Sequence, residues 1–162
     1  GYNEPRNIYK RSKSFNSGEL KERFIHLGVD LWTNAKTPIF APLKGKIHSF
    51  KNNLGEGNYG PTIILAHQLK GQSFYTLYGH LTSKSLENLK VGGVIESGEA
   101  FASIGTYPEN GDYPPHLHFQ VIKDIKGMAG DFPGVTSLTK QNADLENCPD
   151  PNLILKIKTN SS

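Results

Sequence analysis

The sequence has a single cysteine, Cys148, among its 162 residues. An internal disulfide is therefore excluded, and so is a zinc site built from several thiolates. A metal ion bound by this chain would have to be held mainly by histidine and carboxylate side chains. The polar opening stretch GYNEPRNIYKRSKSF contains no signal peptide, and we expect the chain to be a domain trimmed from a larger protein.

Long apolar runs and blocks of like charge are also missing. No stretch approaches the ~20 apolar residues that cross a bilayer, so no membrane span is predicted. The 18 Lys and Arg residues nearly balance 15 Asp and Glu residues, for a formal charge of +3. This mild and scattered charge does not indicate a nucleic-acid-binding groove.

Glycine and proline, in contrast, are frequent: 17 glycines and 10 prolines divide the chain into short segments. Most of these segments are rich in β-branched and aromatic residues, which favours a mainly β fold of two antiparallel sheets packed or rolled together. One helix is predicted over 83–89, with Ser83 as a possible cap. Strands are expected within 37–50, 61–67, 73–81, 92–105, 116–124 and 152–158.

The same pattern divides the chain into three parts. Residues 1–22 are expected to be a polar N-terminal lead-in, and 23–126 hold most of the strand-forming segments. Residues 127–162 are expected to form a long irregular loop and a closing strand, packed on the same domain. An irregular connection of this length is commonly functional or part of an interface.

The segment PPHLHFQV (114–121) places two histidines one residue apart. In a strand, residues i and i+2 point to the same side, so His116, His118 and Gln120 would share one face. The apolar residues between them would enter the core. Two imidazoles so placed can bind one ion, or one can bind it while the other acts on substrate. Ordinary surface histidines would give the same pattern.

The segment HLGVDLW (26–32) offers a second pair, His26 and Asp30. In a straight strand these residues would lie ~13 Å apart, too far to share an ion easily. They can share one if the chain bends between them, and Gly28 permits such a bend at low steric cost. A surface histidine followed by a turn aspartate is the alternative interpretation.

The segment YTLYGHL (75–81) supplies one more histidine, His80. Strand alternation would place it on the same face as Thr76 and Tyr78. Gly79 leaves room there for another group to approach the backbone. A strand-end histidine that hydrogen-bonds to a loop is the alternative.

Together these segments can assemble His26, Asp30 and one histidine of the 116/118 pair around a zinc ion. A fourth position would stay open for water, which is typical of a catalytic zinc site. The spacing alone leaves open which histidine of the pair binds the metal. The remaining histidines near the metal would serve acid–base chemistry. His48 and His67 lack such neighbours and are interpreted as ordinary strand histidines.

Four motifs, HLGVDL, TPIFAPLKGKI, YGHL and PPHLHFQV, resemble those of the lysostaphin-type (LytM-like) zinc endopeptidases in order and spacing. The resemblance covers roughly residues 23–124. It implies that His26, Asp30 and His118 bind Zn²⁺, that His116 is the general base, and that His80 stabilises the developing oxyanion. It also implies a compact antiparallel β core, a groove walled by loops, and a peptide or peptidoglycan substrate.

The sequence departs from this family pattern in two places. The stretch NGDYPP stands before HLH, where the family usually has small residues and glycine, and Gln120 replaces a carboxylate often found after HLHF. These differences bear on substrate preference more than on metal binding. We expect Tyr59, Tyr78, Tyr107 and Tyr113 to line the groove.

A second resemblance concerns YGPTIILAH, DFPGV and CPDPNLIL. These stretches are similar to the peptidase-like middle domain of multidomain proteins that also carry phosphotransferase-like and class III aminotransferase domains. This likeness implies a cytoplasmic protein with other domains as partners, and a binding or regulatory module as the alternative function. A wall hydrolase would instead act at the cell envelope or be secreted.

Two other folds share parts of this pattern. A cupin also carries HxH on a strand, but it requires a Glu shortly afterwards, where this chain offers only Asp124. A lipoyl-like carrier would account for glycine turns such as LKGKI and VGGVIESGE, but it leaves the histidines unexplained.

Overall fold

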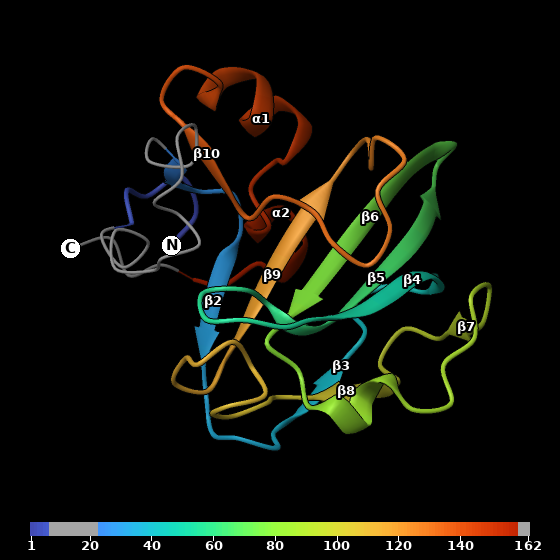
Figure 1. Ribbon diagram of the computed structural model, residues 1–162. Helices are drawn as coiled ribbons and strands as arrows, with labels where there is room; N and C mark the ends of the chain where they lie inside the picture. Colours follow the sequence, from blue (N-terminus) through green and yellow to red (C-terminus); the bar gives the residue numbers. More distant parts are fainter. Residues whose placement is uncertain (7–22, 159–162) are drawn as a thin grey trace.

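The centre of the fold is a six-stranded antiparallel sheet (Figure 1). The structure is a computed structural model that describes residues 1–6 and 23–158. In spatial order the central sheet consists of β2 Val29–Trp32, β9 His116–Ile122, β6 Gln72–Gly79, β5 Gly60–Leu69, β4 Gly45–Asn53 and β7 Val94–Ile95. Two smaller sheets pair β1 Arg23–His26 with β10 Val135–Ser137, and β3 Pro38–Phe40 with β8 Ala100–Ser103. The expected mainly β, antiparallel fold is confirmed.

The strand expected over 152–158 is wrong, because the chain forms the short helix α2 Asn152–Leu155 there. The carboxylate of Asp150 accepts a hydrogen bond from the backbone N–H of Asn152 at 2.8 Å, which favours a turn at the helix start. Leu153 is exposed while Ile154 and Leu155 pack against the core, a pattern that does not alternate as a strand would. The helix expected over 83–89 is a 3-10 helix, η4 Ser83–Leu86, with Thr82 at the N-cap.

The segment after β9 is more regular than expected. It contains β10 and the helix α1 Gln141–Asn147, so the expectation of a long irregular loop is wrong. Most of the expected lead-in, 7–22, lies outside the described residues. Residues 1–6 lie against the domain: the backbone of His26 hydrogen-bonds to Asn3 and Glu4 at 2.9 Å, and the Tyr2 hydroxyl donates to the carbonyl of Cys148 at 2.7 Å.

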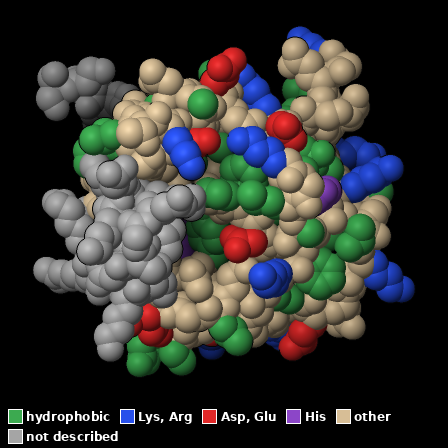
Figure 2. Space-filling model, turned by 45° about the horizontal axis from the view of Figure 1, so that its top comes forward, with side chains coloured by type: hydrophobic (Ala, Val, Ile, Leu, Met, Phe, Trp, Pro, Cys, Tyr) green, Lys and Arg blue, Asp and Glu red, His purple; other side chains and the backbone are tan. Residues whose placement is uncertain are grey.

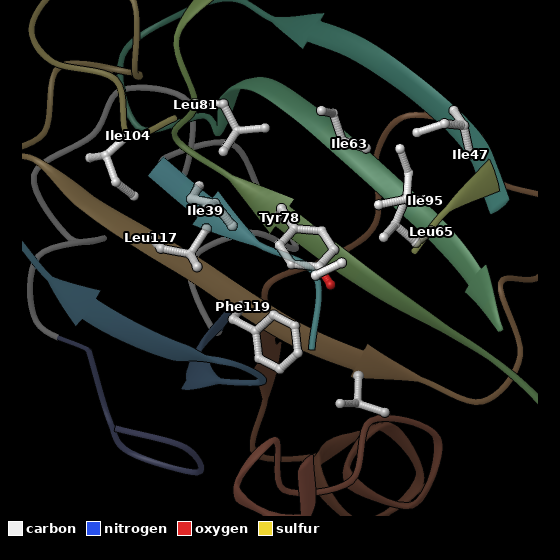
Figure 3. Close-up of a cluster of buried hydrophobic side chains, with 12 residues drawn as sticks. Ile39, Ile47, Ile63, Leu65, Tyr78, Leu81, Ile95, Ile104, Leu117 and Phe119 are labelled. Carbon is white, nitrogen blue, oxygen red and sulfur yellow. The ribbon is translucent and has the colours of Figure 1, made fainter. Parts of the chain in front are cut away.

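Strand register divides the buried side chains between the two faces of the central sheet. Phe119 of β9 lies opposite Tyr78 of β6 and Val29 of β2. Phe119 and Tyr78 belong to the larger core cluster (Figure 3), and the partly buried Val29 packs against it. The other face carries a smaller cluster, in which Leu77 and Ile122 are both fully buried. The segment that follows β9, residues 123–158, is called the C-terminal segment. Three of its residues cover this cluster: Ile125, Phe132 and Cys148.

Charges of both signs lie scattered over the surface. On the face in Figure 2, basic and acidic side chains lie among one another and among apolar groups. Within the described part of the chain, no helix is long and apolar enough to cross a membrane.

The burial pattern along β5 yields a test of the larger cluster. Leu65→Ala should lower the free energy of unfolding by about 2–5 kcal/mol, because Leu65 is fully buried and its removal leaves a cavity. Leu69→Ala in the same strand should change it by less than ~0.5 kcal/mol, because that side chain is 50% exposed. Urea denaturation measures both, and equal losses would contradict the assignment of Leu65 to the core.

Candidate metal centre

Asp30 and His118 face the same side of the sheet because they lie directly opposite each other in the antiparallel pair of β2 and β9. On the other flank of His118, the register of β6 places Gly79. The absence of a side chain at Gly79 makes room for the ring of Tyr59, since a Cβ there would come within 2.7 Å of its Cδ1 atom. The alternation expected for β9 is confirmed: Leu117 and Phe119 enter the larger core cluster.

His26 reaches Asp30 because the chain bends between them. β1 ends at His26, Leu27 and Gly28 form the bend, and β2 begins at Val29. This is the bend that a shared ion would require. A Cβ on Gly28 would lie 2.7 Å from both Cε1 of His118 and the carbonyl oxygen of Phe119, so glycine is needed at this position for close packing as well.

Three polar atoms converge at this point. The Nε2 atom of His26 lies 3.0 Å from Nδ1 of His118, and Oδ1 of Asp30 lies 3.3 Å from each of them. A tetrahedral zinc ion bonded to nitrogen and oxygen at about 2.0–2.1 Å holds its ligand atoms roughly 3.3 Å apart. The triangle of donor atoms therefore has the dimensions of a zinc site, and these three residues could hold a metal ion.

The outer nitrogen of each imidazole has a hydrogen-bonding partner. The side-chain oxygen of Gln120 lies 2.9 Å from Nε2 of His118, and this acceptor favours an N–H there, which leaves a lone pair on the inner Nδ1 atom. The Nδ1 atom of His26 lies 3.0 Å from the carbonyl oxygen of Gly1, which can only accept, and 3.0 Å from Nη2 of Arg6, which can only donate, so these contacts are compatible with either tautomer. A metal ion at the centre would require the lone pair on Nε2 of His26.

Arg6 belongs to this site, although nothing in the sequence marked it. Its Nη2 atom lies 3.2 Å from Oδ2 of Asp30 and 3.0 Å from Nδ1 of His26. One carboxylate oxygen of Asp30 thus faces the imidazoles and the other faces the guanidinium. The ion pair with the Arg6 guanidinium favours the ionised form of Asp30 over the neutral one. Asp30 is therefore ionised at neutral pH.

His116 lies beside the triangle, with Nε2 3.9 Å from Oδ1 of Asp30. Its Nδ1 atom donates to the carbonyl oxygen of Pro114 at 2.7 Å, so in the neutral imidazole Nε2 carries a lone pair. The indole of Trp32, which sequence reasoning did not include, packs on this ring with centroids 4.6 Å apart. Trp32 pairs with His116 across β2 and β9, and this pairing is the signal that could have identified it.

His80 reaches the same side of the sheet by leaving the strand. β6 ends at Gly79, and His80 has a φ of 64°, in the left-handed region. The expected alternation with Tyr78 therefore fails: Tyr78 is 1% exposed in the core, whereas the His80 ring lies 4.2 Å from that of His116. The Nδ1 atom of His80 donates to the carbonyl oxygen of Asn110 at 2.7 Å.

Burial disfavours the charged form of three imidazoles of the site. Burial lowers the pKa of His26 and of His116, and it lowers the pKa of His80 well below its ordinary value. Outside the site, His67 hydrogen-bonds to the carbonyl of Lys44 and to the Thr76 hydroxyl at 2.8 and 2.7 Å, as a strand histidine would.

A cavity of about 150 Å³ opens beside His80. Tyr59 and Tyr113 line it, as expected. The same expectation is wrong for the other two tyrosines: Tyr78 lies in the core, and Tyr107 is 70% exposed and does not line the cavity. Aromatic rings and the imidazole therefore border one space next to the candidate metal position.

Comparison with known proteins agrees with this architecture. The model of peptidase family M23 matches residues 24–130, a range that includes the three ligand candidates, His80 and His116. No curated protein gives a significant match.

Among solved structures, the chain is similar to a Pseudomonas aeruginosa protein described as an M23 peptidase, at 20% identity and TM-score 0.53, over 96% of this chain and 54% of that chain. It is also similar to the catalytic domain of a variant of EnpA, a prophage-encoded M23 protein of Enterococcus faecalis, at 19% identity and TM-score 0.50, over 68% and 79%. The catalytic domain of the antimicrobial peptidase lysostaphin from Staphylococcus simulans is 26% identical, with TM-score 0.49 over 75% and 80%. The first two similarities establish the fold.

Burial of the histidines predicts how stability depends on pH. In the folded protein the pKa values of His26, His67, His80 and His116 are lowered, so below about pH 6.5 the unfolded chain binds more protons. The free energy of unfolding of the metal-free protein should therefore fall as pH decreases through this value, by about 1.4 kcal/mol per pH unit for each extra proton. Thermal denaturation from about pH 8 to about pH 5 measures this, and a midpoint that stays constant or rises would contradict it.

Proposed function

The chain belongs to peptidase family M23, and from this premise we propose that it is a zinc-dependent endopeptidase that hydrolyses amide bonds in peptides of the peptidoglycan type. The observation that carries the proposal is the convergence of Nε2 of His26, Oδ1 of Asp30 and Nδ1 of His118 within 3.0–3.3 Å of one another. The peptidoglycan-type substrate is supported by the four sequence motifs that resemble lysostaphin-type enzymes.

The residues fit a catalytic rather than a structural zinc site. Three protein ligands, two imidazoles and one carboxylate, leave one position of a tetrahedral ion for water or substrate. When bound, zinc would polarise the scissile carbonyl and make an attacking water more acidic. Asp30 contributes the negative charge, and Arg6 holds the carboxylate oxygen that is turned away from the imidazoles.

His116 is suited to take the proton from the attacking water. Its outer nitrogen is bound to the Pro114 carbonyl, so the inner Nε2 lone pair faces the site. Because burial lowers its pKa, this imidazole is neutral near pH 7 and can accept a proton. The Trp32 ring packs against this imidazole at a tilt of 32°, a contact that favours this orientation.

His80 is the candidate group for the developing oxyanion, in a role that depends on a proton. With Nδ1 bound to the carbonyl of Asn110, its neutral form presents a lone pair at Nε2. It can donate to an oxyanion from this nitrogen only after gaining a proton. The His116 ring, 4.2 Å away between centroids, is the neighbour with which it could exchange that proton. Donors at this position contribute most as charge builds on the carbonyl oxygen.

Replacement of individual site residues tests these roles. Asp30→Ala and His118→Ala should lose both zinc and hydrolysis, because each removes a ligand. His116→Ala should keep zinc but lose turnover by about 10²–10⁴-fold, because only the proton acceptor is removed. Mass spectrometry of metal content and digestion of purified muropeptides measure both properties.

His48→Ala is the matched control, since His48 contacts Ser49 on β4 and lies outside the candidate metal centre. Loss of zinc from His116→Ala would show that the roles of the two HxH histidines are reversed. If the zinc-loaded protein binds muropeptides without cleaving them, the chain is a binding module and the proposal is wrong.

A further inference from the structure

Gln120 follows His118 on the same face of β9 and is completely buried. Each end of its side-chain amide has a partner. The Oε1 atom lies 2.9 Å from Nε2 of His118, and the Nε2 atom donates to the carbonyl oxygen of Pro133 at 3.0 Å and faces the sulfur of Cys148 at 3.4 Å. An amide so placed links a candidate zinc ligand to the C-terminal segment.

The surroundings allow only one orientation of this amide. The Pro133 carbonyl can only accept a hydrogen bond, so the NH₂ group must face it. Burial raises the pKa of Cys148 to about 11, so the thiol stays uncharged beside the amide. If the amide were flipped, its oxygen would lie against the Pro133 carbonyl oxygen, and that buried carbonyl would lose its donor. The oxygen therefore faces His118.

We propose that Gln120 is a positioning residue that holds His118 in the tautomer with a proton on Nε2, and so keeps Nδ1 free to bind the metal. The inference rests on the proposed zinc site and deepens it. The Gln120 oxygen is an acceptor on the far side of the ring, and such outer partners fix the ring orientation and the tautomer of metal-binding histidines. The C-terminal segment takes part because Pro133 and Cys148 hold the amide in the required orientation.

The chemistry of the amide separates this positioning role from a structural one. A carboxylate in place of Gln120 could still accept from His118, but in ionised form it could not donate to the Pro133 carbonyl. A methionine of similar length could do neither. Gln120→Glu thus removes the link to the C-terminal segment and keeps the acceptor, whereas Gln120→Met removes both.

The first measurement is the zinc dissociation constant, from competition with a chromophoric chelator, alongside the thermal midpoint of the metal-free proteins. Both variants should melt at lower temperature than the unaltered protein, because both lose the bond to Pro133. Gln120→Met should bind zinc about 10–100-fold more weakly, as is typical when an outer partner is lost. Gln120→Glu should retain most of the affinity. Asn147→Ala, which removes another contact of the C-terminal segment, to the backbone of Asp124, should leave zinc affinity unchanged.

The second measurement detects the tautomer directly in the metal-free protein. Long-range proton–nitrogen NMR spectra of the imidazoles should show the Nε2–H form of His118 in the unaltered protein and in Gln120→Glu, and a mixture of tautomers in Gln120→Met.

Equal zinc affinity of Gln120→Met and the unaltered protein would overturn the inference and leave the zinc site standing. Equal losses in both variants would overturn it too, because affinity would then follow stability alone. If the unaltered protein binds no zinc, the proposed function fails. The NMR spectra then still test whether Gln120 sets the tautomer of His118.

Discussion

The convergence of three side chains that can bind a metal ion is the constraint on which the rest of this structure depends. One nitrogen of each of two imidazoles and a carboxylate oxygen lie 3.0–3.3 Å apart, and the three side chains are largely buried. Holding these polar groups together away from water costs free energy, so the fold must keep them in place. The register of β2 on β9 fixes Asp30 opposite His118, and the bend at Gly28 brings His26 back to them. Core packing on both faces of the sheet keeps these strands in register.

Much of this site could be predicted from the sequence, because it follows from strand periodicity. The HxH pattern predicts two imidazoles on one face of a strand, and Gly28 marks where the chain can turn between His26 and Asp30. His80 could not be assigned in this way, since its left-handed backbone places it off the alternating pattern. Arg6 could not be predicted either, because it lies far from the other site residues in the sequence and reaches them only through tertiary packing.

The secondary structure likewise depends partly on the local sequence and partly on contacts with distant parts of the chain. Segments with clear alternation became strands, whereas the apolar stretch after Pro151 became a helix, because Asp150 and Pro151 favour a turn there. The order of the C-terminal segment depends on a surface that the sequence does not display, the second face of the central sheet. Phe132 and Cys148 become buried only against that face. The local sequence pattern predicts which secondary structure a segment can form. The surface against which the segment packs decides whether that structure forms.

The four histidines of the site, His26, His80, His116 and His118, have one feature in common. The outer nitrogen of each lies within hydrogen-bonding distance of an uncharged oxygen. These oxygens belong to the backbone of Gly1, Asn110 and Pro114 and to the side chain of Gln120. The imidazoles of His80, His116 and His118 therefore present a lone pair inward, and none of the four has a carboxylate as its outer partner. The negative charge among the candidate ligands comes from Asp30 alone, and Arg6 offsets part of it. A dication held here would keep more of its own charge than one with carboxylate-backed histidines, and that favours polarisation of a bound carbonyl.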